Sequence, residues 1–236
     1  MTIIDAHCHF GEWPFPIRSY GKAETLRLMD DFGIALGIFS SAKAVLYDFR
    51  EGNRELAPVI AGEPRMRGYV VVNPNYPEES RRELDTYLAR PGFVGVKCHS
   101  AYTAQPPTSP GFRSLLPHLA ELGRPVKYHA GFEQVAAVAR DFPQLAFIVP
   151  HQGFLGEEAG QAPPNVYADF CGTPSDHDRI GSLVRSLGAD HVLFGTDLTL
   201  INPAGILGML EEADLPDADR ELVLWRNACR LFGLEV

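Results

Sequence analysis

Apolar positions along the chain follow two alternating patterns, short β-rich runs and longer segments with the spacing of amphipathic helices. The runs with the length and composition of strands cover residues 2–9, 34–42, 66–73, 92–99, 125–130, 145–151, 165–172 and 191–197. Helical periodicity separates most of them, at residues 22–33, 53–62, 77–89, 111–123, 132–142 and 176–188. Two closing helices are predicted at residues 203–214 and 217–234.

This order of elements predicts the fold class. Strands that alternate with helices pair in parallel through right-handed crossovers. Eight such units predict an α/β fold, a (β/α)₈ TIM barrel in which residues 1–236 form a single domain. The sixth unit differs, because residues 152–164 read QGFLGEEAGQAPP. Its glycines and prolines leave room for one helical turn at most, so we expect the sixth helix to be abbreviated.

Composition and charge narrow the class of protein. The chain has 236 residues, of which 45% are hydrophobic, and its formal net charge of -9 disfavours a nucleic-acid surface. No apolar run approaches the roughly 18–20 residues of a membrane span, and the start lacks the basic leader of a signal peptide. The four cysteines stand singly, without a CxxC pair. We therefore expect a cytoplasmic protein with no nucleic-acid or membrane partner.

Polar residues gather at the predicted carboxyl ends of the strands, where the active site of a TIM barrel lies. These residues are His7, His9, Lys97, His99, His129, His151 and Asp197. His7 and His9 stand two residues apart in the stretch IIDAHCHFG, so in a strand they share one face. Imidazole and carboxylate are ligands that zinc and similar divalent ions prefer. His129 and Asp197 would complete the shell and leave a position for water, whose pKa a bound ion lowers to about 7.

Several of these stretches resemble the amidohydrolase superfamily. They are DAHCH on the first strand, PVKYHAG on the fifth, PHQG on the sixth, GTD on the eighth, and NACRLFGL near the end. The chain is more similar to the amidohydrolase-2 branch, which includes aminocarboxymuconate-semialdehyde decarboxylase. The resemblance implies that His7, His9, His129 and Asp197 bind one divalent ion. This donor set suits zinc in the first place, and manganese or another divalent ion is an alternative. The resemblance also implies that His151 moves a proton in catalysis and that Asp197 accepts one from the bound water.

Lys97 has two interpretations. As a structural residue it would be a buried ammonium paired with Asp5 or Asp197. In other branches of the superfamily, a lysine on the fourth strand is carboxylated and bridges two ions, which would recruit His129 and His151 to a second ion. Asp5 is expected one layer deeper in the barrel than His7, where it would form hydrogen bonds with interior polar groups such as Lys127.

The loops after the strands are expected to shape the substrate pocket. We predict that Lys97, His99, Arg18 and Tyr102 contact the substrate. Other loop residues that would line the pocket are Trp13, Phe15, Tyr20, Lys43, Tyr47 and Arg50. Aromatic walls with a few cations suit a small anionic or ring-bearing molecule.

The leading functional hypothesis is a metal-dependent hydrolase that uses metal-activated water on a small-molecule amide, ester or lactone. The alternative is a metal-dependent, non-oxidative decarboxylase or hydratase of a small carboxylated substrate. A deoxyribonuclease of the TatD kind also opens with HxH, but it carries a metal-binding glutamate where this chain reads GVKCHS. A barrel that serves only as a binding module would be expected to lack some of the metal ligands, and this sequence contains the full set. The sequence leaves the oligomeric state open, and a homodimer is the commonest assembly.

Overall fold

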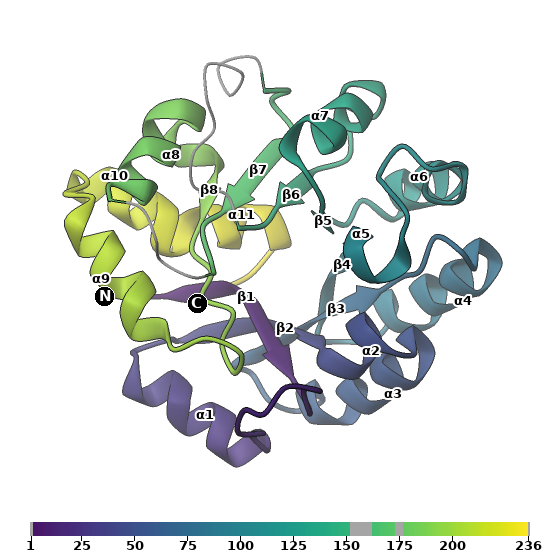
Figure 1. Cartoon of the computed structure of the whole chain (residues 1–236), viewed down its shortest axis with the longest axis horizontal. Coiled ribbons are helices and arrows are strands. Elements are labelled where there is room, and N and C mark those ends of the chain that lie inside the picture. Colours follow the sequence, from purple (N-terminus) through teal and green to yellow (C-terminus); the bar gives the residue numbers. More distant parts are fainter. Residues whose placement is uncertain (1, 152–161, 173–176, 236) are drawn as a thin grey trace.

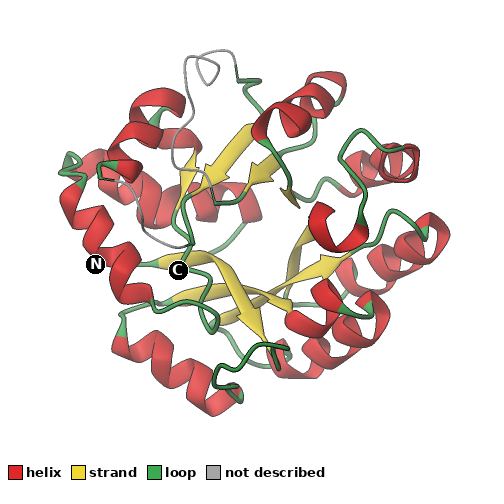
Figure 2. Cartoon of the chain, viewed as in Figure 1, coloured by secondary structure: helices red, strands yellow, loops and turns green. Residues whose placement is uncertain are grey.

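The computed structural model describes residues 2–151, 162–172 and 177–235. Eight parallel strands follow one another around a barrel in the order β1 to β8, and the helices lie outside them (Figure 1; Figure 2). The strands are β1 (Ile4–Phe10), β2 (Leu36–Ser41), β3 (Met66–Val71), β4 (Phe93–His99), β5 (Val126–His129), β6 (Phe147–Val149), β7 (Val166–Asp169) and β8 (Val192–Leu193). All eight predicted strands are therefore confirmed, most of them with shorter bounds.

Backbone hydrogen bonds bring the last strand against the first. The Ala6 amide donates to the carbonyl of Phe194 at 2.9 Å, and the Asp197 amide donates to the carbonyl of His7 at 2.8 Å. The His9 amide donates to Leu198 in the same way, at 3.1 Å. The predicted (β/α)₈ barrel is thus confirmed, and Asp197 is held beside His7 by the main chain.

The helices fill the crossovers between strands. They are α1 (Lys22–Asp31), α2 (Ala42–Leu46), α3 (Phe49–Ile60), α4 (Pro77–Leu88), α5 (Ser100–Thr103), α6 (Pro110–Leu122), α7 (Phe132–Asp141), α8 (Arg179–Leu187), α9 (Pro203–Glu212), α10 (Asp217–Glu221) and α11 (Asn227–Phe232), with a 3₁₀ turn η2 (Ala189–His191) and a π-helical segment η3 (Leu222–Arg226). Each helix predicted outside residues 152–164 has a counterpart. The prediction missed α2 and α5, because helices of four or five residues carry too little periodicity to detect.

Local sequence signals explain where helices begin and end. The Ser109 hydroxyl accepts a hydrogen bond from the Phe112 amide, and Pro110 opens α6 with its φ already set for a helix. Gly123 closes the same helix with a φ of 60°, a left-handed conformation that glycine adopts without steric cost. The abbreviated sixth helix was predicted within residues 152–164, and residues 152–161 lie outside the described residues.

Burial divides the strands into two faces. On β4, Val96 and Cys98 join the large cluster under the helices, while Lys97 and His99 point to the other face, inside the barrel. At the amino-terminal ends of the strands, the interior is filled by a second cluster in which Ile4 and Tyr69 pack with Phe232 of α11. The apolar plug at this end leaves the polar interior residues at the opposite, carboxyl-terminal end.

The contact between α2 and α3 depends on glycine at position 52. A Cβ added to Gly52 would lie 2.2 Å from the Ala44 backbone nitrogen, so one helix would have to shift. We expect Gly52→Ala to lower the free energy of unfolding by about 1–3 kcal/mol, the usual cost of overpacking. In the matched variant Gly208→Ala, the added Cβ meets nothing within 4 Å, and a stabilisation of about 0.5–1 kcal/mol is expected in helix α9. Urea unfolding measures both, and equal stability of the two variants would contradict the packing of α2 on α3.

Candidate metal centre

The two histidines of β1 are buried with one ring nitrogen each already bound by the protein. Nδ1 of His7 lies 3.1 Å from Oδ2 of Asp169, and Nδ1 of His9 lies 3.1 Å from the Ser40 hydroxyl. A metal-binding histidine commonly uses its second nitrogen in this way, because the bond fixes the tautomer and the orientation of the ring. His7 and His9 therefore present their Nε2 atoms to the mouth of the barrel.

Asp197 faces both of these Nε2 atoms. Its Oδ1 lies 3.3 Å from Nε2 of His7 and 3.3 Å from Nε2 of His9, yet this buried oxygen accepts no hydrogen bond from the described residues. The residue has a φ of 60°, which turns the chain sharply after β8 and directs the carboxylate inward. An orphaned carboxylate oxygen between two imidazole nitrogens is a donor set that suits a divalent cation.

His151 and His129 continue the site beyond Asp197. Nδ1 of His151 lies 3.6 Å from Oδ2 of Asp197, and the His151 amide donates to Asp169 at 3.1 Å. The His129 ring stands between two others, with its centroid 4.5 Å from that of His151 and 3.9 Å from that of His99. The structure thus brings all four predicted ligands and the predicted proton carrier to one end of the barrel.

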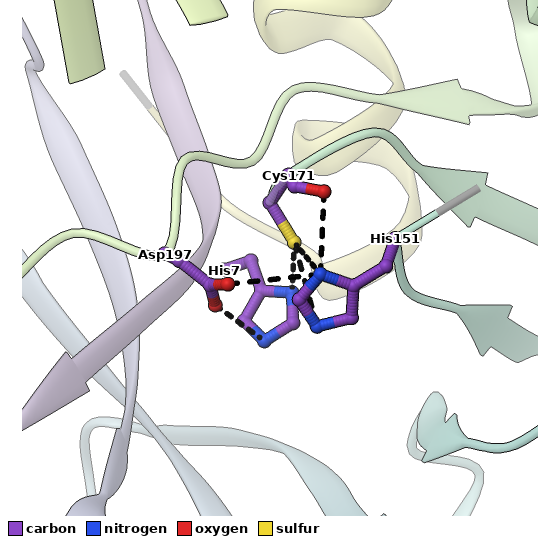
Figure 3. A group of neighbouring side chains, drawn as sticks. All are labelled: His7, His151, Cys171 and Asp197. Atoms are coloured by element: carbon purple, nitrogen blue, oxygen red, sulfur yellow. Dashed lines mark hydrogen bonds and ion pairs between the residues drawn. The ribbon is translucent and has the colours of Figure 1, made fainter. Parts of the chain in front are cut away.

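One donor was missed by the sequence interpretation. Cys171 follows β7, and its Sγ lies 2.8 Å from Nδ1 of His7 and 3.3 Å from Nδ1 of His151. Figure 3 shows these side chains turned toward one another together with Asp197. One donor atom from each of His7, His151, Cys171 and Asp197 lies within 4.8 Å of the other three. This tight group contains two of the predicted ligands, and His9 and His129 lie next to it.

Asp169 was also missed, and it organises the layer beneath the histidines. Its carboxylate lies 2.7 Å from Nζ of Lys127 and 3.1 Å from Nδ1 of His7, and it accepts the Cys171 thiol at 2.9 Å. The sequence held a signal for both residues, because Asp169 and Cys171 stand two apart at the end of a strand, as His7 and His9 do. A cysteine was not counted among the polar strand-end residues, and so this pair was overlooked.

The expected partner of Asp5 was wrong. Asp5 accepts hydrogen bonds from the His7 amide at 2.9 Å and from the amide and hydroxyl of Thr196. Lys127 pairs with Asp169 instead, because β5 and β7 direct these two side chains into the same interior layer. Burial raises the pKa of Asp5 to about 6. Asp5 therefore ties the turn after β8 to the backbone of β1.

Lys97 lies directly against a predicted ligand. Its Nζ is 2.8 Å from Nε2 of His7, and the side chain is buried. Burial and the nearby charge of Lys127 lower its pKa to about 8. The two predicted carboxylate partners of Lys97 form no ion pair with it among the described residues, and the amine instead faces the histidine cluster.

Burial keeps His7, His9 and His129 neutral at pH 7. It lowers the pKa of His129 to about 3 and holds the pKa values of His7 and His9 below the ordinary value, with the nearby lysine ammonium groups adding to the effect. Burial raises the pKa of the Cys171 thiol. Burial also opposes ionisation of Asp197, but His7 and His9 outweigh it and hold the pKa of that carboxyl below its ordinary value. Neutral imidazoles beside an ionised carboxylate are ready to bind a cation.

The predicted substrate residues fall into two groups. The rings of Tyr102 and His99 lie 4.4 Å apart, and Trp13 packs edge-on against His9 with centroids 4.9 Å apart, so these residues flank the histidines. Arg18 is exposed and pairs with Glu24 at 2.6 Å. It lines a pocket of about 340 Å³ with residues 198–203, which follow Asp197. A larger cavity of about 780 Å³ lies near the starts of β3 and β4, away from the histidines.

The remaining loop cations point elsewhere. Lys43 pairs with Glu55 on helix α3, and Arg50 pairs with Asp48 and Glu79. Tyr47 is exposed. These side chains were predicted to line the pocket. In the structure, Lys43 and Arg50 instead pair with carboxylates at the surface.

A comparison of the sequence with protein families decides the relationship. The family described as Amidohydrolase (Amidohydro_2) matches residues 4–234, nearly the whole chain. The chain belongs to the amidohydrolase family. The resemblance drawn from the sequence motifs is therefore confirmed, and the chain is an enzyme of the metal-dependent type that the family comprises. A comparison with curated proteins found no match.

Solved structures share the fold of this amidohydrolase at low sequence identity. The 5-carboxyvanillate decarboxylase from Sphingomonas paucimobilis is 16% identical, with a TM-score of 0.78 and 99% of both chains covered. A dihydroxybenzoic acid decarboxylase from Polaromonas sp. JS666, with bound manganese, is 21% identical, with a TM-score of 0.77 and 98% of this chain and 97% of that chain covered. Amidohydrolase 2 from Bifidobacterium longum subsp. infantis is 18% identical, with a TM-score of 0.74 and all of both chains covered. Among the described residues, no helix has the length and apolarity needed to cross a membrane.

Proposed function

We propose that this amidohydrolase is a metal-dependent hydrolase of a small-molecule amide, ester or lactone. The observation that carries the proposal is the buried Oδ1 of Asp197, which lies 3.3 Å from the Nε2 atoms of His7 and His9 without accepting a hydrogen bond from the described residues. A buried, unpaired carboxylate oxygen costs free energy. A divalent cation would satisfy this oxygen and bind both nitrogens, taking the place of the Lys97 ammonium at Nε2 of His7.

The proposed ligands are His7, His9, His129 and Asp197, with zinc as the first candidate. When bound, the ion would polarise a carbonyl and lower the pKa of a water molecule. His7 is held for this role by Asp169, and His9 by Ser40, so both rings are oriented in advance. This support matters because small misplacements of a catalytic group are costly.

Proton transfer is assigned to Asp197 and His151. Oδ2 of Asp197 lies 3.6 Å from Nδ1 of His151, within reach of a tighter contact once substrate is present. Asp197 would accept a proton from the attacking water, and His151 would deliver one to the leaving group.

A neutral substrate is favoured by the charges of the loops. Arg18, Lys43 and Arg50 are each paired with a carboxylate at the surface, so none of them is left to bind a substrate carboxylate. Trp13 and Tyr102 flank the histidines and offer aromatic walls.

The four cysteines are free thiols, which supports a reducing compartment such as the cytoplasm.

A second candidate is a decarboxylase of a small carboxylated substrate, and Lys97 favours it. Its buried amine has a pKa of about 8, so at pH 7 it is largely an ammonium beside His7 that could bind a carboxylate. The fold neighbours named above include decarboxylases of 5-carboxyvanillate and dihydroxybenzoic acid. Lys97→Met separates the two functions, because it should abolish decarboxylation and leave hydrolysis of a neutral ester measurable.

The test is a substrate panel on zinc-loaded and manganese-loaded protein. Neutral lactones, esters and amides are assayed by chromatography for the acid product, and hydroxybenzoates are assayed in parallel for carbon dioxide. The proposal predicts acid formation from members of the neutral set. Release of carbon dioxide with no hydrolysis of any neutral compound would replace it with the second candidate.

Removal of the ion should abolish turnover and weaken the fold. We expect protein treated with a chelator to lose activity and to recover it with one equivalent of zinc. Because the ion binds only the folded chain, the free energy of unfolding should rise by about 2.7 kcal/mol when free zinc is 100 times its Kd. Calorimetry with and without zinc measures this difference. Unchanged activity and melting temperature after chelation would contradict the proposed metal dependence.

A further inference from the structure

Cys171 occupies a place among the donors that the predicted ligand set does not use. It follows β7, and its side chain is fully buried at the mouth of the barrel. Its Sγ lies 3.3 Å and 3.9 Å from the two ring nitrogens of His151 and 2.8 Å from Nδ1 of His7. A buried thiol surrounded by imidazoles and a carboxylate differs from a core cysteine, which packs among apolar groups.

The spacing of these donors is close to that of a metal shell. With Zn–S near 2.3 Å and Zn–N near 2.0–2.1 Å, two ligands of a tetrahedral ion stand roughly 3.5 Å apart. One donor atom from each of His7, Cys171 and Asp197 lies within 4.8 Å of the others, and His151 belongs to the same group. Cys171 and Asp197 follow β7 and β8, two neighbouring strands, and Figure 3 shows their side chains converging.

A further observation points to a ligand at this position. Oδ1 of Asp197, whose side chain is 3% exposed, accepts no hydrogen bond from the described residues and lies 3.3 Å from Nε2 of His7, another member of the group.

We propose that Cys171 is a thiolate ligand of the metal ion at the barrel mouth, beside Asp197 and in place of His129, which is not a member of this group of donors. This inference rests on the metal dependence proposed above and moves one ligand from β5 to β7. The ion then keeps four protein ligands and an open position, and His151 stays available for proton transfer.

The surrounding charges are compatible with a bound thiolate. In the structure the thiol donates to Oδ1 of Asp169, whose negative charge is balanced by the ammonium of Lys127 at 2.7 Å. A divalent ion replaces the thiol proton, which leaves to solvent, and its charge stabilises the sulfur anion. The Lys127–Asp169 pair then sits beneath the sulfur as a neutral unit.

A sulfur ligand sets the class of metal. Thiolate favours zinc and cobalt over manganese and magnesium, which prefer oxygen ligands. Loss of Cys171 should therefore weaken zinc binding by about 10-fold to 100-fold, a loss comparable to that seen when the support of a ligand is removed. Manganese binding should change little, so the ratio of the two affinities reports on the sulfur.

The experiment is the absorption spectrum of the cobalt-loaded protein. A cobalt–thiolate bond gives an intense charge-transfer band in the near ultraviolet, which nitrogen and oxygen ligands do not give. We expect the band in the wild type and in Cys98→Ser, a matched control for a buried cysteine on the outer face of β4. It should be missing in Cys171→Ser, with the visible ligand-field bands of bound cobalt retained.

X-ray absorption of the zinc-loaded wild type gives a second readout that needs no variant. A sulfur scatterer at about 2.3 Å is expected. One bound ion per chain with only nitrogen and oxygen neighbours would overturn the Cys171 ligand and leave the proposed hydrolase intact. Failure of the wild type to bind zinc or cobalt would overturn both proposals.

Discussion

Replacing Asp197 by asparagine should lower kcat/KM by about 10²-fold to 10⁴-fold, the range that positioned acid–base groups contribute. Asparagine keeps the shape of the side chain but removes the charge that faces His7 and His9 at 3.3 Å, and it cannot accept a proton from water. The same change should reduce the metal content of purified protein. The assay uses whichever substrate of the panel the wild type turns over.

An exposed aspartate provides the matched control for this prediction. Asp217 lies at the start of α10, at the protein surface, and Asp217→Asn should leave both kcat/KM and metal content at the wild-type level. Activity of the Asp197 variant within about threefold of the wild type would remove Asp197 from the proposed mechanism.

Lys127→Met should lower the free energy of unfolding by about 3–5 kcal/mol, the cost of leaving one partner of a buried ion pair alone. Lys127 and Asp169 are both fully buried and lie 2.7 Å apart, and Nζ of Lys127 also donates to the Ala6 carbonyl at 2.6 Å. Methionine fills much of the same volume, so the loss reports on charge rather than on a cavity. Urea unfolding of the metal-free protein measures it.

The pH dependence of this loss has a defined sign. Burial would raise the pKa of Asp169, but Lys127 outweighs it and holds the pKa well below its ordinary value. The pair thus stabilises the wild type above pH ~4 and ceases to do so as pH falls further. In the variant, Lys127 no longer opposes the effect of burial, so the protonated carboxyl is better accommodated than in the wild type, although the contacts of Asp169 with His7 and the His151 amide remain. The difference in stability should therefore be largest near pH 7 and shrink below pH ~4.

A double variant separates charge from packing. Lys127→Met combined with Asp169→Asn removes the unpaired carboxylate, so it should regain part of the stability lost in Lys127→Met alone. If the double variant is less stable than the single variant by the full cost of a second deletion, the two side chains do not act as a pair.

The sequence predicted the barrel because its strands carry the information locally. The β-branched run of MRGYVVV and the helical spacing of PEESRRELDTYL each indicate their own element, and the regular alternation of such units leaves few other topologies. The ends of elements were less accurate. The strands β6 and β8 end at Val149 and Leu193, before their predicted ends at residues 151 and 197. At those two positions His151 and Asp197 take left-handed backbone conformations that no propensity of histidine or aspartate specifies.

The site was predictable where spacing along one strand sets geometry. His7 and His9 share a face because side chains alternate with a period of two along a strand. Asp197 and His151 were predicted near them because the active site of a TIM barrel lies at the carboxyl ends of its strands. The partners of Lys127 and Lys97 depend on which interior layer each strand contributes, and this register is a tertiary property. The outward pairing of Arg18 with Glu24 likewise follows from the path of a loop. Cys171 had the right spacing from Asp169, but a cysteine alone gives no sign of its neighbours.

The central claim is that this barrel holds a divalent ion at His7, His9 and Asp197, and elemental analysis of purified protein tests it most directly. We predict about one zinc or manganese ion per chain in the wild type and loss of that ion in both His7→Ala and Asp197→Ala. About two ions per chain would instead support a carboxylated Lys97 that bridges a pair. Wild-type protein that contains no metal, and takes up none when dialysed against zinc or manganese, would contradict the claim.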